Sequence, residues 1–173
     1  LRVHGKVARY LPGVGSGSGC AEEQALTPSP LNARGEINRA MHLVDGHLES
    51  DLPLPSEFTV ALWYWLGERS GASEREGCLV RLPSGQELIV RQGADHKSRL
   101  SLGELNGSTS LPADEWNMVI LVRAKEQLQV HLNGELRAEL EARFTPSKPV
   151  SLRFGERLEG KLDEIAVWDR ALT

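Results

Sequence analysis

Apolar and polar residues alternate over short segments of this 173-residue chain, and no segment keeps a helical spacing of apolar residues over three turns. Turn residues recur at intervals of about 8 to 12 positions. Strands that follow one another without intervening helices are typical of an antiparallel all-β sandwich, so we expect that fold class. The predicted strands cover residues 2–10, 58–66, 77–82, 86–92, 99–105, 116–123, 127–132, 135–140, 150–154 and 162–168.

Two segments carry the clearest local signals. Residues 58–66 are rich in aromatic and β-branched residues, which predicts a central strand that is apolar on both faces and needs a layer on each side. Asn133-Gly134 stands between two alternating runs, which is the strongest short-range hairpin signal. The residues at 135–142 favour helix by composition, but their strict alternation predicts a returning strand instead.

The chain is predicted to form one domain, with an irregular start. Residues 1–36 contain one short strand and then a glycine- and serine-rich stretch at 11–19, which has the composition of a loop or linker. The pattern changes at Ile37, and we assign residues 37–173 to the sandwich itself. The chain opens at Leu1 without a signal-peptide pattern, and we interpret it as a fragment or a mature product.

Charge and cysteine content narrow the function classes. Twenty basic and 24 acidic residues are interleaved and give a net charge of −4, which disfavours nucleic acid and anionic lipid as partners. No apolar run approaches the roughly 20 residues of a membrane helix, so no membrane insertion is expected. Cys20 and Cys78 are too few for a zinc site, and they form either one disulfide in an exported protein or two unpaired thiols.

Four segments of the chain carry sequence patterns that recur together. They are residues 41–46 (MHLVDG), 58–63 (FTVALW), 116–122 (WNMVILV) leading into 129–134 (QVHLNG), and 160–172 (GKLDEIAVWDRAL). In this order they resemble the laminin G-like domain of the concanavalin A-like lectin/glucanase superfamily, over residues 37–173. The N-terminal residues 1–36 depart from that pattern, so no property of the family's first strand is assigned to this chain.

The resemblance implies a two-sheet jelly-roll sandwich and a non-catalytic role. Such a domain is expected to bind a glycan or a protein as part of a larger secreted or cell-envelope protein. A purely architectural spacer domain without a ligand is the second hypothesis, and a glycoside hydrolase is the third. The sequence does not indicate the oligomeric state.

The hydrolase hypothesis needs two carboxyl groups about 5 to 9.5 Å apart. Glu139 and Glu141 have the right strand parity, but they alternate with leucine and alanine and so indicate a solvated face. Asp163 and Glu164 are adjacent and point to opposite faces. We therefore expect no enzymatic activity and no catalytic residue.

Four tryptophans dominate the aromatic residues of the chain. Trp63, Trp116 and Trp168 lie in the segments of the resemblance, and we expect core packing for them. Trp65 and Tyr64 point to opposite faces, so Trp65 is the candidate platform on which a sugar ring stacks. The predicted core consists of Leu43, Val60, Leu62, Trp63, Trp116, Val119, Leu121, Val130, Leu132, Leu152, Ile165 and Val167.

A structural calcium ion is the one cofactor that the resemblance implies. Calcium takes carboxylate and backbone carbonyl oxygens. In many members of the superfamily the aspartate of the final strand supplies the carboxylate, and an Asp-Gly turn before the second strand supplies carbonyls. Asp163 and Asp45-Gly46 match those positions, and the five histidines show no paired ligand spacing.

Overall fold

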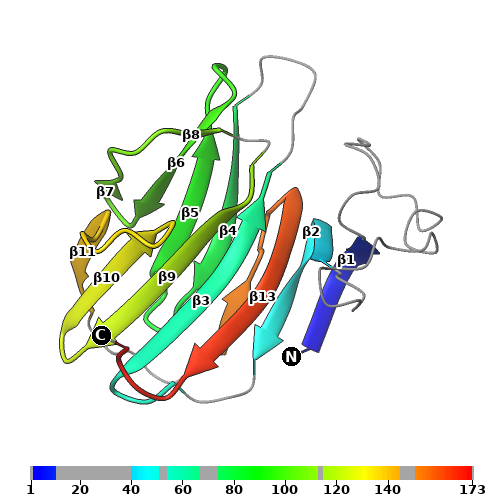
Figure 1. Ribbon diagram of the computed structural model, residues 1–173. Coiled ribbons are helices and arrows are strands. Elements are labelled where there is room, and N and C mark those ends of the chain that lie inside the picture. The colour runs from blue at the N-terminus through cyan, green and yellow to red at the C-terminus, as the bar shows by residue number, and fades with distance from the viewer. Residues whose placement is uncertain are drawn as a thin grey trace, which may run out of the picture.

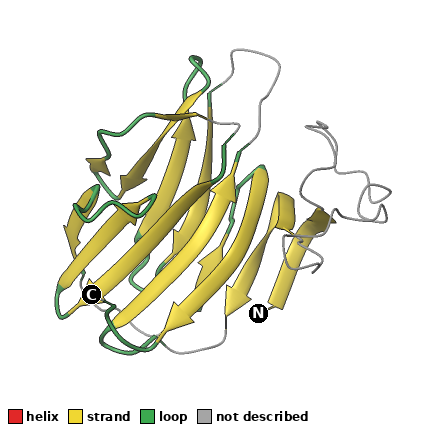
Figure 2. Cartoon of the chain, viewed as in Figure 1, coloured by secondary structure: helices red, strands yellow, loops and turns green. Residues whose placement is uncertain are grey.

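The computed structural model describes residues 2–10, 40–50, 54–66, 74–112, 115–144 and 151–172, with the backbone alone for residues 2–10 and Asp45. Every regular element in these ranges is a β-strand, and the strands pair antiparallel (Figures 1 and 2). The all-β antiparallel prediction is confirmed. The same ranges contain no helix that is long and apolar enough to span a bilayer.

Thirteen strands lie within the described ranges. They are β1 (Arg2–Tyr10), β2 (Ala40–Ser50), β3 (Phe58–Trp65), β4 (Arg75–Arg81), β5 (Glu87–Gln92), β6 (Lys97–Leu102), β7 (Leu105–Asn106), β8 (Leu111–Pro112), β9 (Asn117–Ala124), β10 (Gln127–Leu132), β11 (Leu140–Arg143), β12 (Leu152–Phe154) and β13 (Gly160–Trp168). Most ends agree with the sequence prediction to within two residues, because alternation and turn residues locate them.

The strands form two packed layers along one hydrogen-bonded path, in the order β11-β10-β9-β3-β13-β2-β12-β4-β5-β6-β7. We call the layer from β11 to β2, together with β1, sheet I, and the layer from β12 to β7, together with β8, sheet II. In Figure 1, β9, β3 and β13 of sheet I lie in front of β4, β5 and β6 of sheet II. The two layers enclose the core.

Strand β2 joins the two sheets. Residues 41–43 of β2 pair with β13 in sheet I, and residues 48–50 pair with β12 in sheet II. The sequence analysis expected a turn at Asp45-Gly46, and this expectation is wrong. Both residues lie inside β2, opposite Lys6 and Gly5 of β1, so backbone pairing prevails over the turn preference of the dipeptide.

The core consists of the inward residues of both sheets. Eight residues of the predicted core are buried: Leu43, Val60, Leu62, Val119, Leu121, Val130, Leu132 and Leu152. The prediction is wrong for Trp63 and Trp116, which are half-buried, and for Ile165 and Val167, which pack only partly against the core. Among the side chains that the structure describes, the buried aromatic residues are instead Phe58, Tyr64, Phe144 and Phe154.

The predicted hairpin at Asn133-Gly134 is correct in its turn and wrong in its strand. Asn133 and Gly134 have φ values of 51° and 80°, and the Glu135 amide donates to the Leu132 carbonyl at 3.0 Å. The chain then leaves the ladder until Leu140, where β11 begins, and Leu136 is 96% exposed. Tertiary contacts of the 135–139 segment, described below, replace the expected strand.

The structure corrects the end of one predicted strand and confirms another strand. The strand predicted at 99–105 ends at Leu102, because the chain turns at Gly103, whose φ is 58°. Asn106 then belongs to β7. The predicted strand at 2–10 is present and pairs with β2. The glycine- and serine-rich stretch at 11–19 and Cys20 lie outside the described residues, while the thiol of Cys78 is free and buried.

Candidate functional site

Trp65 is the last residue of β3 and lies on the outer face of sheet I. Its neighbour Tyr64 is fully buried, so the prediction that the two side chains point to opposite faces is confirmed. The ammonium nitrogen of Lys161 lies 3.9 Å from the centroid of the Trp65 ring. One side of this half-buried ring therefore carries a cation–π contact, which occupies that side.

The outer face of sheet I is apolar along β3 and β9. Trp63 shares the face of Trp65, and its direct cross-strand partners are Met118 of β9 and Asp163 of β13. Trp168 is half-buried as well, opposite Thr59. The expectation of core packing for these tryptophans fails because odd-numbered positions of β3 face away from the sandwich interior.

The residues predicted for calcium do not meet in the structure. Asp163 lies in β13, where its Oδ1 accepts a hydrogen bond from the Glu164 amide at 2.8 Å, and burial raises the pKa of its carboxyl group. The ladder of β13 with β2, continued by one position, sets Asp163 opposite Ala40. The backbone of Asp45 is five residues further along β2, or about 16 Å. The calcium ion stays a prediction.

A pocket of about 630 Å³ opens on sheet II where β4, β5, β6 and β7 approach one another. None of its residues was predicted as a site residue. Because direct cross-strand partners share a face, the ladder pairs place Glu76, Arg91, Arg99, Ser101 and Asn106 together on the outer face. The full lining is Glu74, Arg75, Glu76, Arg91, Gln92, Gly93, Arg99, Leu100, Ser101 and Asn106.

Two arginines define the charge of this pocket. Arg91 and Arg99 are direct cross-strand partners, and like charges in that position repel each other. The Nε of Arg91 lies 3.3 Å from a carboxylate oxygen of Glu76, with both side chains about half exposed at 51% and 50%. Arg99 makes no ion pair with any residue that the structure describes. Its guanidinium is thus available to a ligand.

Uncharged polar groups lie beside the arginines. Ser101 is 1% exposed, and its hydroxyl has no hydrogen-bond partner within the described ranges. The direct cross-strand partner of Ser101 is Asn106, whose side chain is exposed. Gln92 accepts a hydrogen bond from Nε of Arg75, and its own buried Nε2 lacks a partner among the same residues. Both unpartnered atoms are enclosed in the wall of the pocket, so a ligand would bond to them only if a neighbouring side chain moved aside.

The sequence held a signal for this pocket. Residues 86–92 and 99–105 were predicted as successive strands, and a hairpin between them that is centred on Asp95 sets position 91 opposite position 99. Two arginines in that relation are unfavourable for the stability of the sheet, and this is the signal by which sequence alone could have singled out the pair. The contribution of β4 and β7 depends on long-range pairing, which the sequence does not show.

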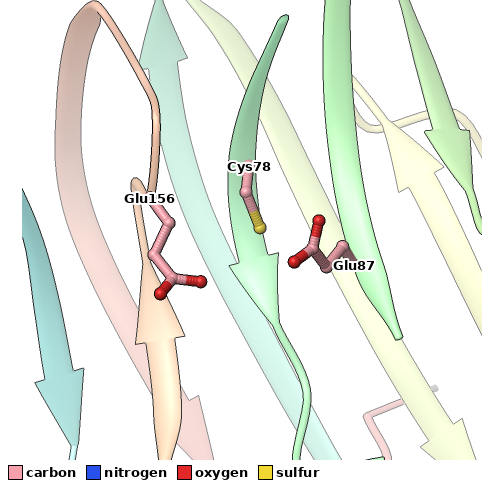
Figure 3. Close-up of side chains that lie close together, drawn as sticks. All are labelled: Cys78, Glu87 and Glu156. Atoms are coloured by element: carbon pink, nitrogen blue, oxygen red, sulfur yellow. The ribbon is translucent and has the colours of Figure 1, made fainter. Parts of the chain in front are cut away.

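A second cluster on sheet II brings together Cys78, Glu87 and Glu156, whose ligand-type atoms lie within 4.8 Å of one another (Figure 3). Burial raises the pKa of the Cys78 thiol to about 12, so the sulfur keeps its proton. A metal ion would need the thiolate and free carboxylate oxygens.

Arginines already hold both carboxylates of this cluster. Arg157 Nη2 lies 2.6 Å from Glu87 Oε2, Arg81 Nε lies 2.7 Å from Glu156 Oε2, and Arg81 also pairs with Glu87. Burial acts to raise the pKa of Glu87, but hydrogen bonds from Arg157 and Arg81 outweigh it and lower that pKa. The cluster is a structural ion-pair network between β4, β5 and the turn after β12.

Glu139 and Glu141, the glutamates tested for catalysis, have separate structural contacts. The Glu139 carboxylate accepts hydrogen bonds from the amide and hydroxyl of Thr109, each at 2.7 Å. Glu141 accepts a bond from Gln129 at 3.1 Å. The Glu139 contacts tie segment 135–139 to the loop before β8, which explains why this segment leaves the sheet.

The two-layer antiparallel sandwich has the architecture of concanavalin A-like proteins. The family model described as the concanavalin A-like lectin/glucanases superfamily, of the laminin G type, matches residues 43–173, and the chain belongs to that family. The resemblance expected from the four sequence segments is thereby confirmed. No curated protein sequence matches the chain at a significant level.

Solved structures with this architecture include three informative neighbours. Domain 4 of the extracellular arabinanase AbnA from Geobacillus stearothermophilus, in complex with arabinotriose, is 19% identical, with 82% of this chain and 75% of that chain covered and a TM-score of 0.54. A heptameric pentraxin from Limulus polyphemus is 17% identical, with 73% and 71% covered and a TM-score of 0.51. Sheep galectin-11 is 13% identical, with 73% and 99% covered and a TM-score of 0.51. At these identities the likeness shows the fold.

Proposed function

We propose that this chain is a non-catalytic glycan-binding module of a larger extracellular or cell-envelope protein, and that the β4–β7 pocket of sheet II is its saccharide site. The family supports a carbohydrate- or protein-binding role. The arabinanase domain of the same fold carries arabinotriose in its complex. A glycan is the better fit for this chain because charged and hydrogen-bonding side chains, such as Arg99 and Asn106, stand beside apolar surface in the lining of the pocket.

The observation that supports this site most directly is a set of hydrogen-bonding groups in the pocket wall, among them the buried Ser101 hydroxyl that lacks a partner. Saccharides present a ring of hydroxyl groups that both donate and accept, and binding pockets use a few placed polar groups to orient them. Ser101, Asn106 and the guanidinium of Arg99 offer complementary groups within one pocket. No residue that the structure describes forms a hydrogen bond with the Ser101 hydroxyl.

The carboxylates of the pocket do not suit glycoside hydrolysis. A hydrolase needs a protonated acid beside a second carboxylate. Glu76 is half exposed, and its carboxylate is engaged in an ion pair with Arg91. We therefore assign Glu76 to charge balance and expect no release of reducing sugar from polysaccharides.

A glycan array with the purified domain tests this proposal. Wild-type protein should bind a defined class of saccharide, and Ser101→Ala should weaken that binding about threefold to tenfold through loss of one hydrogen bond. Leu136→Ala, at a 96% exposed position outside the pocket, is the matched control and should bind as wild type does. An array without a bound glycan would favour a protein ligand or the architectural spacer.

Trp65 is the second candidate for sugar contact, because an aromatic ring matches the apolar face of a pyranose. The Trp65→Ala variant is tested for binding on the same glycan array. Loss of binding in Trp65→Ala with full binding in Ser101→Ala would move the site from the pocket to the outer face of sheet I.

A further inference from the structure

We propose that the β4–β7 pocket selects saccharides that carry a carboxylate, and that the cross-strand arginines Arg91 and Arg99 hold this group. The inference rests on the proposed glycan-binding function and names its ligand class. Uronic acids and sialic acids are the sugars with this chemistry.

The repulsion between Arg91 and Arg99 lowers the stability of the protein when no ligand is bound. Direct cross-strand partners have Cβ atoms about 4.5–5.5 Å apart, and like charges at that separation destabilise a sheet. The lining holds three arginines against two glutamates. Among the described contacts, only the Glu76–Arg91 pair balances Arg91 or Arg99, and it is half exposed and weak. A bound anion would remove this repulsion.

The geometry of the free donors favours a carboxylate. A guanidinium has five N–H donors in a planar fork that matches the two oxygens of a carboxylate. Glu76 engages only Nε of Arg91, and Arg99 is unpaired in the described structure. The third arginine, Arg75, is directed elsewhere, since its Nη2 donates to the Leu66 carbonyl at 2.7 Å. Arg91 and Arg99 are therefore the pair that meets the ligand.

Neighbouring uncharged groups indicate that the carboxylate is attached to a sugar. Ser101 shares the outer face with Arg99 two residues earlier in β6, and Asn106 lies opposite Ser101. When the arginines hold the carboxylate of a sugar, the Ser101 hydroxyl and the Asn106 carboxamide are the neighbouring groups that can bond to the hydroxyl groups of the same sugar ring. An acidic peptide would present carboxylates but no ring of hydroxyls.

Calorimetry with matched ligands tests the selectivity. The probes are trigalacturonate, its methyl ester, in which an uncharged –COOCH₃ group replaces each carboxylate, and a glucuronate and a sialyl oligosaccharide of similar size. At least one carboxylate sugar should bind about tenfold tighter than its ester or neutral counterpart, and the difference should shrink at high salt. A sulfated disaccharide and a triglutamate peptide complete the panel and should bind weakly.

Substitutions test whether Arg91 and Arg99 cause the preference for carboxylate sugars. Arg99→Gln and Arg91→Gln should each lose the preference for the charged sugar, while Arg143→Gln, an 87% exposed position on β11, should keep it. Arg99→Gln should melt at the same temperature as wild type or higher, because it removes like-charge repulsion. This melting measurement shows that lost binding does not reflect unfolding.

The outcomes separate the two proposals. Equal binding of the ester and the acid, with Ser101→Ala still weakening both, would overturn carboxylate selectivity and leave the glycan site in place. Tighter binding of the sulfated sugar or of triglutamate would overturn the carboxylate-sugar assignment. No binding of any acidic sugar would overturn the inference, and an empty glycan array as well would overturn the proposed function.

Discussion

Adjacent residues of β3 differ in burial because successive side chains of a strand point to opposite faces. Tyr64 is fully buried in the sandwich, while Trp63 and Trp65 are half-buried on the outer face. The sequence identified the strand but not which face was inside, since both faces are apolar. A large aromatic side chain is thus not evidence of burial when both parities of a strand are apolar.

Trp116 and Phe154 provide a matched comparison of half-buried and buried aromatic residues. Phe154→Ala should lower the free energy of unfolding by about 3–5 kcal/mol, because its side chain is fully buried. Trp116→Ala should cost about 1–2 kcal/mol, since part of its ring stays in water in the folded state. Urea unfolding measures both values. Equal losses would place Trp116 in the core, as the sequence first suggested.

Glu139 is expected to make stability depend on pH. Burial acts to raise the pKa of Glu139, but hydrogen bonds from Thr109 and Ser108 outweigh it, so the pKa lies below its ordinary value of 4.5. The stabilisation is complete above pH 4.5 and is lost as the pH falls through the folded-state pKa. Glu139→Gln should therefore lower the melting temperature at pH 7 and lose this difference in acid. Glu141→Gln, with one exposed contact to Gln129, should show little change at either pH.

Elements were predictable where turn chemistry and alternation agreed. Residues 127–132 and 2–10 form strands with the predicted ends. Strand β2 was missed because its centre contains Asp45-Gly46, and β11 was misplaced because Glu139 binds Thr109 across the sheet. Both differences arise from contacts between distant parts of the chain, which a local pattern does not contain.

Gly155 controls the connection from β12 to β13. Its φ is +77°, and a Cβ at this position would stand well inside van der Waals contact with Leu43 of the core. Gly155→Ala should cost about 2–4 kcal/mol, from a strained backbone and an overpacked core together.

Gly85→Ala is the control for Gly155→Ala. Gly85 has a φ of +79°, but no atom lies within 4 Å of the position of an added Cβ. This variant should show backbone strain alone, about 1–2 kcal/mol. Denaturant unfolding of both variants isolates the clash, and equal losses would contradict a close approach of Gly155 to Leu43.

At the scale of the whole molecule, the fold class followed from the sequence and the candidate pocket did not. The family resemblance was recognised from segments that are contiguous in sequence, such as 160–172, and the family model matches residues 43–173. The pocket depends on β4, β5, β6 and β7 coming together, with Arg91 and Arg99 as its centre. Local alternation marks the strands but does not order them in a sheet.

Calcium dependence is a prediction about the whole domain. A calcium site that uses Asp163 should raise stability by roughly 2.7 kcal/mol at 100 times its dissociation constant. Burial raises the pKa of Asp163, and a bound cation would oppose this by favouring the ionised carboxylate. Thermal melts with calcium and with chelator measure the effect, and Asp163→Asn should abolish it while exposed Asp169→Asn should not. Superimposable wild-type curves would make Asp163 an ordinary structural carboxylate.

Strand β13 lies between β3 and β2, although it is the last described strand along the chain. During synthesis the edges of β2 and β3 therefore remain unpaired until residues 160–168 have left the ribosome. Unpaired edges invite pairing with other chains, and sheets closed by distant segments fold slowly. A nascent chain stalled before Gly160 would thus present two open edges, and chaperone binding during translation would matter most at that length.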